Sequence, residues 1–197
     1  FRRVLFRSPI KIDITNRLAV PSLEHPLGTD HFGRDMLSRI LFGGQRLLVI
    51  AVLAVGLGLL LGVPVGLFAG YAGGWLDSLA MRVVDGLLAF PGILLFLLFM
   101  TVAQAYKLDG PARDAVMVVA LGFAFMPETA RLMRATMLNE RSKEYVEAAR
   151  LMGNSTRYIV VREILPNCIS PMIVHTTVYL GIVILAVAAL SYLGLGT

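Results

Sequence analysis

The chain of 197 residues is 57% hydrophobic and only 16% charged, and its mean hydropathy is +0.75. Soluble domains carry roughly 25% charged residues, so this composition excludes a water-soluble globule with an ordinary polar surface. The net charge of +5 does not indicate a nucleic-acid-binding protein, because the basic residues lie between long apolar runs. We therefore expect a helical membrane protein.

The first 46 residues are more polar than the rest of the chain. Residues 1–8 contain three arginines and match nothing that follows, so they are interpreted as a non-native lead and set aside. Residues 9–46 are expected to form an extracytoplasmic leading segment, in which 33–46 make an amphipathic helix on the membrane surface. Four of its side chains are of metal-ligating types: His25, Asp30, His31 and Asp35. Their spacing fits neither a zinc site nor a facial triad, so no metal site is predicted.

The first membrane span is predicted over about 47–72, because the chain carries no charge there. Pro64 is expected to kink this span. A glycine recurs at every fourth position, which places four of them along one helix face: Gly58, Gly62, Gly66 and Gly70. Because small residues let two helices approach closely in lipid, this face is predicted to pack against another span.

Three further apolar stretches complete a set of four predicted spans, of which the third is the weakest because its uncharged run covers only residues 115–127. The second covers about 86–106 and is expected to kink at Pro91, and the third covers about 112–130. The fourth covers about 173–193. The sequence therefore predicts an all-α, polytopic membrane protein with four spanning helices in this stretch.

Three residues in or beside these spans carry ionisable or reactive groups. Glu128 lies near the end of the third span, where it is expected to pair with Arg131. His175 lies inside the fourth span, where a lone imidazole is either functional or satisfied by a neighbouring helix. Cys168 has no second cysteine with which to form a disulfide and is interpreted as an inert packing thiol.

The polar segment 131–166, between the third and fourth spans, is predicted to be a helical hairpin. Its first helix is expected over 142–152, with four residues sharing one apolar face: Tyr145, Ala148, Ala149 and Met152. Gly153 suits the left-handed turn that ends a helix. This face indicates either a docking surface for another protein or an amphipathic hairpin lying on lipid, and periodicity leaves both open.

The remaining residues of the hairpin also have expected roles. The opposite face of the first helix is expected to carry the pairs Lys143–Glu147 and Glu147–Arg150. Asn154 or Ser155 is expected to cap a second helix. The hairpin is therefore predicted to be a folded unit and not a loose connection.

Part of this hairpin resembles the EAA loop of ABC-importer permeases. The resemblance is carried by Glu147-Ala148-Ala149, then Gly153 after three intervening residues, then Leu165-Pro166. It implies that segment 131–166 is cytoplasmic and forms the coupling helix that inserts into a cleft of an ATPase subunit. The residues expected to couple the chain to that partner are Tyr145, Glu147, Ala148, Ala149 and Gly153.

Other segments are similar to the dipeptide, oligopeptide and nickel branch of these permeases. They are 25–30 (HPLGTD), 70–75 (GYAGGW), 89–92 (AFPG) and 190–196 (LSYLGLG). The resemblance implies that 47–197 is a truncated type I ABC-importer transmembrane domain. It also implies a six-span subunit, with one span expected before residue 9 and one after Thr197.

The resemblance further implies a multi-pass protein of the bacterial inner membrane that imports peptides, or nickel and related small solutes. The implied partners are a homologous second permease, two ABC ATPase subunits or domains, an extracytoplasmic solute-binding protein and the lipid bilayer, without nucleic acid. The sequence has no GxxxxGK[ST] phosphate-binding loop. ATP and its hydrolysis are therefore expected on the partner subunits, and this chain is expected to be no enzyme and to hold no cofactor.

Two other classes of protein are weighed against this interpretation. An ion-coupled secondary transporter is the alternative, but it would need intramembrane acids or inverted repeats, and we identify neither. A scaffold protein that transports nothing would not need spans with proline kinks and a glycine face. Charge does not settle the orientation, because eight Lys or Arg lie on the expected inner side and ten on the outer side. The orientation therefore rests on the resemblance.

Overall fold

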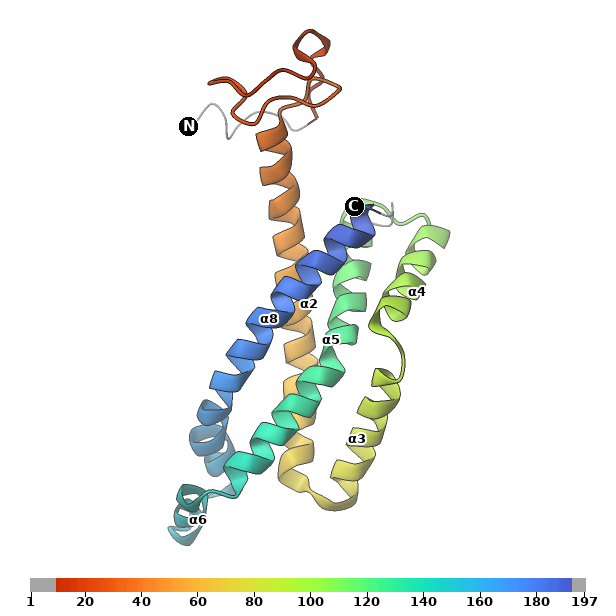
Figure 1. Ribbon diagram of the computed structural model, residues 1–197. Coiled ribbons are helices and arrows are strands. Elements are labelled where there is room, and N and C mark those ends of the chain that lie inside the picture. The colour runs from red at the N-terminus through yellow and green to blue at the C-terminus, as the bar shows by residue number, and fades with distance from the viewer. Residues whose placement is uncertain (1–9, 193–197) are drawn as a thin grey trace. The chain divides into compact units, whose positions relative to one another are not determined.

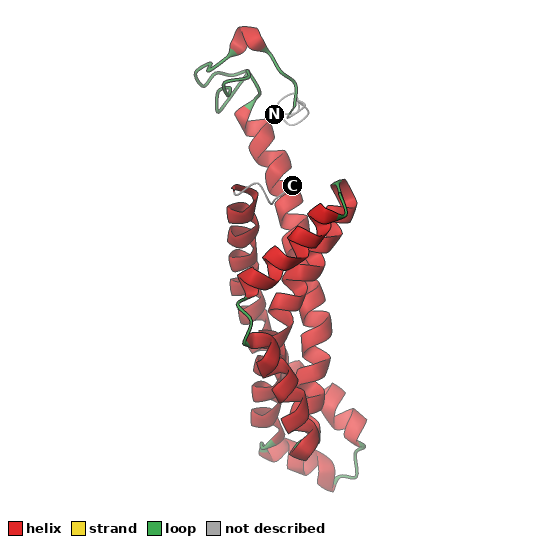
Figure 2. Ribbon diagram, turned by 90° about the vertical axis from the view of Figure 1, so that its right-hand side faces the viewer, coloured by secondary structure: helices red, strands yellow, loops and turns green. Residues whose placement is uncertain are grey.

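The computed structural model describes residues 10–192 (Figure 1). The predicted non-native lead, 1–8, lies outside the described residues. The chain divides into two compact units, residues 1–49 and residues 50–197. From Met36 on, the described residues form helices joined by short turns, whereas 17–35 is loop (Figure 2), with a single isolated β-bridge between Thr29 and Asp35 and no strand among residues 10–192. The predicted all-α class is therefore confirmed.

From α2 onward the described helical elements follow one another with short connections. In chain order they are η1 (Ile14–Asn16), α2 (Met36–Ala72), α3 (Gly74–Leu88), α4 (Gly92–Ala105), α5 (Gly110–Arg141), α6 (Glu144–Leu151), α7 (Thr156–Tyr158), η2 (Ile159–Ile164) and α8 (Leu165–Tyr192).

The first unit is organised around two buried carboxylates. Asp30 accepts hydrogen bonds from the backbone N–H groups of Phe32 (2.8 Å) and Arg34 (3.0 Å), and it pairs with the side chains of Arg34 and Arg39. Burial alone would disfavour its charge, but these hydrogen bonds and the nearby Arg34 guanidinium hold the pKa of Asp30 well below its usual value. The turn around Asp30 is therefore fixed by charge-assisted hydrogen bonds.

The second carboxylate, Asp35, caps the start of α2. It accepts hydrogen bonds from the backbone N–H (2.8 Å) and the hydroxyl (2.7 Å) of Ser38, which satisfies a free donor of the first helical turn. The Nδ1 atom of His25 lies 2.9 Å from the same carboxylate. The separate amphipathic helix expected over 33–46 is not what the structure shows. Met36 instead begins one continuous helix that runs to Ala72, because no proline interrupts it before the span.

In the second unit, the glycine face of α2 packs against α5. A Cβ atom added at Gly62 would lie 2.8 Å from the Cβ of Thr129, and one added at Gly70 would lie 2.8 Å from the Cβ of Met137. Added Cβ atoms at the other two glycines of the face would collide with Phe125 at Gly58 and with the carbonyl of Ala130 at Gly66. Any larger residue at these four positions would push the two helices apart.

Helix α5 lies at the centre of the second unit, where it contacts α3, α4 and α8 as well as α2 (Figure 1). Its largest fully buried side chains are apolar: Met117, Phe125, Met133 and Met137. Cys168 on α8 is also fully buried, as expected of a packing thiol. The core of the second unit therefore runs along α5, and the surrounding helices pack against it.

Three described helical stretches are long and apolar enough to span a membrane, or four if the pair α3 and α4 counts as one span bent by 72°. The predicted second span, 86–106, is not one helix. Helix α3 ends at Leu88, and α4 begins at Gly92 after Pro91. Proline at this point excludes the preceding residue from helical geometry, so the break is sharper than the predicted kink. Pro64, by contrast, lies inside a continuous α2.

The ionisable residues of the spans have partners that differ from those expected. Arg131 pairs with Asp85 on α3 (Nη2–Oδ1, 2.5 Å), whereas Glu128 forms no ion pair with any residue that the structure describes. The His175 ring stacks on Phe125, with 5.1 Å between ring centroids. Its buried Nε2 atom has no hydrogen-bond partner among residues 10–192. The imidazole is therefore held by aromatic packing and not by a polar neighbour.

Candidate functional site: the polar hairpin between α5 and α8

The first helix of the hairpin, α6, is shorter than the 142–152 expected. It begins after Lys143 and ends at Leu151. Glu144 and Glu147 lie in its first turn and Arg150 in its last, so the charges oppose the partial charges of the helix ends. These side chains stabilise a helix of only eight residues, which would be marginal in isolation.

The turn after α6 has the predicted left-handed geometry. Gly153 has φ +78°, a conformation that costs a residue with a Cβ atom about 1–2 kcal/mol. Ser155, one of the two expected caps, accepts a hydrogen bond from the backbone N–H of Tyr158 (3.3 Å). The chain then continues through α7 and the π-helical turn η2 into α8 without a break. The hairpin is therefore joined rigidly to α8 at its far end.

The inner face of the hairpin packs into the core of the second unit. Val146 is fully buried and Ala149 is 3% exposed. They lie in one cluster with residues from α5, η2 and α8, namely Met133, Met137, Ile159, Ile164, Cys168 and Met172. The prediction that Ala149 lies on the same exposed stripe as Ala148 is therefore wrong. The hundred-degree step between neighbouring residues turns Ala149 toward α5 and α8.

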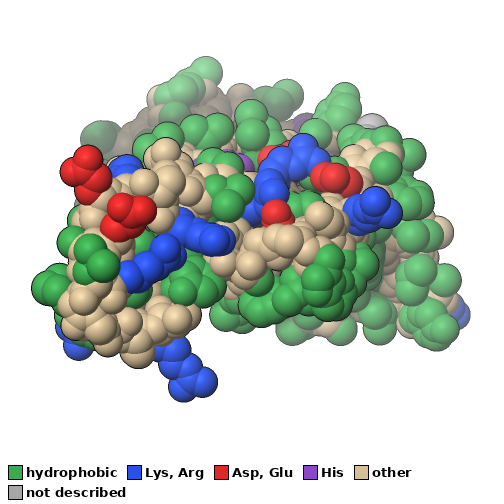
Figure 3. Space-filling view, turned by 90° about the horizontal axis from the view of Figure 1, so that it is seen from below, with side chains coloured by type: hydrophobic (Ala, Val, Ile, Leu, Met, Phe, Trp, Pro, Cys, Tyr) green, Lys and Arg blue, Asp and Glu red, His purple; other side chains and the backbone are tan. Residues whose placement is uncertain are grey.

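The outer face of the hairpin is exposed. Glu147 and Ala148 lie on it, as does Gly153 at its tip. Leu151 and Met152 are 89% and 74% exposed. Leu151 was not among the residues predicted for this face, although its position three residues after Ala148 places both on one helix face. Seen from below, this end of the molecule shows acidic, basic and apolar side chains side by side (Figure 3). Two large exposed apolar side chains at a tip are typical of an interaction surface.

Tyr145 lies at the base of the hairpin and not on its outer face. Its hydroxyl donates a hydrogen bond to Oε2 of Glu140 (2.9 Å) and accepts one from Nδ2 of Asn167 (3.3 Å). Burial and the bond to the carboxylate raise the pKa of Tyr145, so the hydroxyl stays protonated as a donor. Lys143 also binds Glu140 (2.6 Å), in place of the expected pair with Glu147. Glu140 is therefore the anchor of the hairpin base.

A second attachment joins the end of α5 to the end of α2. The Nη1 atom of Arg141 lies 2.7 Å from the carbonyl oxygen of Tyr71 and 3.3 Å from that of Gly70. These carbonyls belong to the last turn of α2, where intrahelical donors are absent and a cation is favourable. The hairpin base is thus fixed to α2 as well as to α8.

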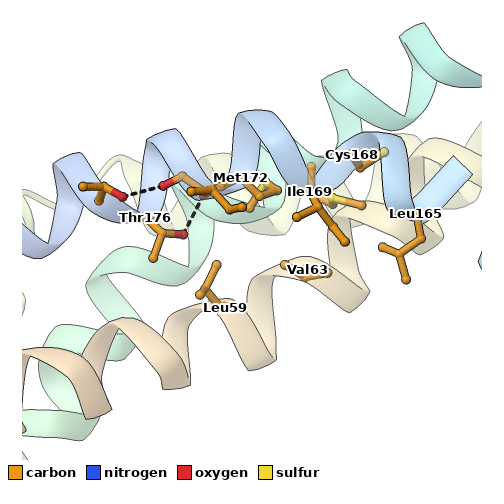
Figure 4. Close-up of a pocket in the computed structure, with 10 residues that line it drawn as sticks. Leu59, Val63, Leu165, Cys168, Ile169, Met172 and Thr176 are labelled. Atoms are coloured by element: carbon orange, nitrogen blue, oxygen red, sulfur yellow. Dashed lines mark hydrogen bonds between the residues drawn. The ribbon is translucent and has the colours of Figure 1, made fainter.

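An apolar groove of about 310 Å³ lies above the hairpin core (Figure 4). Leu59 and Val63 of α2 face Ile169, Met172 and Thr176 of α8 across it. The hydroxyl of Thr176 is occupied by a hydrogen bond to the carbonyl of Met172 (2.7 Å). The groove therefore presents almost no free polar group, and it is unsuited to hold a charged solute.

Comparison with known proteins identifies the family. The model of the family described as binding-protein-dependent transport system inner membrane component matches residues 62–197. A putative peptide transport system permease protein of Brucella suis is 42% identical over 189 residues, which are 96% of this chain and 61% of the relative. A dipeptide transport system permease protein of Alkalihalophilus pseudofirmus is 39% identical over 92% of this chain, which corresponds to 58% of the length of that relative.

A third relative belongs to the same group. The glutathione transport system permease protein of Pectobacterium atrosepticum is 40% identical over 89% of this chain and 56% of its own length. The chain thus spans about three fifths of the length of the curated relatives that it matches. With its apolar spanning helices, it is a member of the family of binding-protein-dependent transport system inner membrane components, in the peptide branch of the ABC-importer permeases, and a multi-pass protein of the inner membrane.

Proposed function

We propose that the chain acts as a permease subunit of an ATP-driven importer of peptides, and that the outer face of the α6 hairpin couples it to an ATPase. The named relatives support peptides in preference to nickel, since they transport peptides, dipeptides or glutathione by name. The observation that carries the coupling assignment is the division of the hairpin into a buried inner face and an exposed outer one. The inner face holds it to the spanning helices and the outer face is open to a partner.

The outer face suits insertion into a cleft of another protein. Ala148 leaves room for close approach, while Leu151 and Met152 offer apolar surface at the tip. Glu147 adds a charge that fixes orientation. The proposed contact residues are therefore Glu147, Ala148, Leu151, Met152 and Gly153. Ala149 and Tyr145 act from inside, by holding the hairpin in place.

The proposed complex contains this permease, a homologous second permease, two ATPase subunits and an extracytoplasmic solute-binding protein. ATP binds and is hydrolysed on the ATPases. Their closure moves the two hairpins, and each hairpin moves α5 and α8 because it is fixed to both at its base. The cavity between the permeases then changes from outward to inward access. Such a change is a rigid-body motion of packed helices driven by a bound partner.

The test uses the full-length permease with its partner subunits in proteoliposomes. Glu147→Lys and Leu151→Asp are expected to abolish ATP-driven uptake and to weaken co-purification of the ATPase, because both place an unfavourable charge at the contact. The matched control is Arg162→Glu, which reverses an exposed charge on the same hairpin outside the proposed face. Normal uptake by both face variants would disprove the coupling assignment. Uptake without any ATPase would support an ion-coupled carrier instead.

A further inference from the structure

The second unit carries charged side chains that are exposed on the helices of the bundle. Asp85 on α3 and Arg131 on α5 form an ion pair whose side chains are 59% and 57% exposed. Glu128 lies three residues before Arg131, so the two side chains share one face of α5. Ala135 continues this exposed face one turn further on. We refer to Asp85, Glu128 and Arg131 as the charged face.

The glycine contacts of α2 give the depth of this face in the membrane. Gly62 packs against Met126 and Thr129, so Glu128 lies at its level. Gly62 is ten residues from the end of α2 at Ala72, which corresponds to about 15 Å along the helix. The hydrocarbon core of a bilayer is about 30 Å thick. Glu128 is therefore level with the interior of a charge-free span.

The ion pair lies at a similar depth. Gly66 packs against Ala130 and Arg134, which places Arg131 about 9 Å inside the end of α2. Asp85 shares this level because it binds Arg131. Exposing charged groups to lipid at this depth is strongly unfavourable. The charged face must therefore meet either water or another protein.

The polar groups of the face are only partly used within the second unit. Arg131 has five N–H donors, and one ion-pair contact, from Nη2 to Asp85, engages it. Glu128 has no hydrogen bond or ion pair with the described residues. A carboxylate and a guanidinium with free capacity are thus presented side by side. This arrangement matches a solute that carries both an ammonium and a carboxylate group.

An apolar cavity of about 230 Å³ lies beside the charged face, between α4, α5 and α8. Ala124, one turn before Glu128 on α5, is among its lining residues. The others include residues from all three helices: Gly92, Phe96, Leu121, Tyr179 and Val183. Gly92, where the break between α3 and α4 ends, therefore lies at the cavity, as does Ala124 one turn from Glu128. Charged groups next to an apolar cavity are the usual composition of a site for a small amphipathic molecule.

We propose that the charged face lines the water-filled translocation pathway and is a contact site for the charged ends of a zwitterionic peptide. Glu128 and Asp85 receive the peptide ammonium group, Arg131 receives its carboxylate, and the cavity beside Ala124 accepts an apolar side chain. This inference rests on the proposed function as a peptide importer, which it extends to particular residues of the pathway.

Accessibility to an aqueous reagent tests the location. In the full-length transporter with Cys168→Ala, Glu128→Cys and Ala135→Cys are expected to react with a membrane-impermeant, cationic methanethiosulfonate. Val83→Cys is the control, because Val83 is also 59% exposed on α3 but points away from Asp85. It is expected to remain unmodified. Ala135→Cys leaves the three residues of the charged face unchanged. It therefore shows whether a lack of reaction in Glu128→Cys results only from misfolding of that variant. Failure of Glu128→Cys to react would overturn the inference, whether lipid or the second permease covers the face, because Ala135 is level with Gly70 near the end of α2 and can also be reached from bulk water.

Transport measurements test the contact with substrate. Glu128→Gln and Arg131→Gln are expected to lower peptide uptake per ATP hydrolysed by about tenfold, the loss expected from one charge-assisted hydrogen bond. ATP hydrolysis stimulated by the loaded binding protein is expected to persist. Arg162→Gln is the control and is expected to transport normally.

The outcomes separate this inference from the proposed function. Wild-type uptake together with unimpaired uptake by both glutamine variants would overturn the contact site and leave the importer assignment intact. A wild-type complex that neither imports peptide nor responds to the binding protein would overturn both.

Discussion

The hydroxyl of Tyr145 donates a hydrogen bond to the carboxylate of Glu140, with 2.9 Å between the two oxygens. The same hydroxyl accepts a hydrogen bond from Asn167. Because Glu140 belongs to α5, Tyr145 to α6 and Asn167 to α8, one phenol oxygen joins three helices at the base of the hairpin. A force applied to the exposed tip of α6 would reach both long helices through this junction.

The first prediction concerns removal of the Tyr145 hydroxyl, which forms that junction. Tyr145→Phe is expected to lower the free energy of unfolding by about 1 kcal/mol, the usual net value of a hydrogen bond. It is also expected to raise the ATP hydrolysed per peptide imported, since the hairpin is then held less firmly. Tyr158→Phe, at a residue that is 45% exposed, is the control for removal of a phenol oxygen. The junction has no coupling role if the two variants show the same ratio of ATP to peptide.

The second prediction concerns the contact between α2 and α5. Gly66→Val is expected to destabilise the protein by about 1–3 kcal/mol, because the added methyl groups collide with the backbone of α5 at Ala130. Gly56→Val introduces the same side chain on the same helix where no atom lies within 4 Å. Thermal unfolding of the purified, detergent-solubilised protein measures the difference. Equal melting temperatures for the two variants would show that the glycine face is not a close contact.

The third prediction concerns the turn at Gly153. Gly153→Ala is expected to cost about 1–2 kcal/mol, since alanine resists the left-handed backbone found there. Gly153→Asn is expected to cost less, because asparagine tolerates that conformation. Gly86→Ala serves as the control, at a helical glycine with open space around it. If Ala and Asn at position 153 were equally tolerated, backbone strain would not explain the glycine.

The sequence predicted features that depend on local geometry. The four-residue glycine repeat identified the face of α2 that meets α5, because helical periodicity alone brings Gly58 to Gly70 into line. Gly153 was recognised as a left-handed turn because its position after a helix favours that conformation. Both inferences require only the residues that lie close by in the sequence.

Features that depend on which surface a helix meets were not predictable. Lipid is as apolar as a protein core, so hydrophobicity does not mark the side of a spanning helix that is buried. In the polar hairpin, two adjacent alanines likewise did not show which of them is buried, so Ala149 was placed on the same face as Ala148 although it packs into the core. The same limit hid the pairing of Arg131 with Asp85, 46 residues away. Intramembrane acids were consequently judged absent, whereas Asp85 and Glu128 lie level with the apolar stretch of α2.

The fourth prediction concerns the leading segment. Asp30→Asn removes the charge that binds Arg34 and Arg39 and is expected to loosen the turn around it. The pKa of Asp30 in the folded protein is below the ordinary value of 3.8, so its stabilising effect is complete above about that pH. This stabilising effect is lost as the pH falls toward the pKa of Asp30 in the folded protein. At neutral pH, the Asp30→Asn variant should therefore resemble the wild type at low pH.

Hydrogen exchange of the backbone amides of Phe32 and Arg34 measures this loosening, because both donate to Asp30 in the folded turn. At pH 7, Asp30→Asn is expected to speed their exchange relative to wild type. Glu24→Gln removes an exposed carboxylate from the same segment and is expected to leave the rates unchanged. Unchanged protection in Asp30→Asn would mean that the charge of Asp30 is not needed to hold the turn, since the asparagine side-chain oxygen can still accept from both amides.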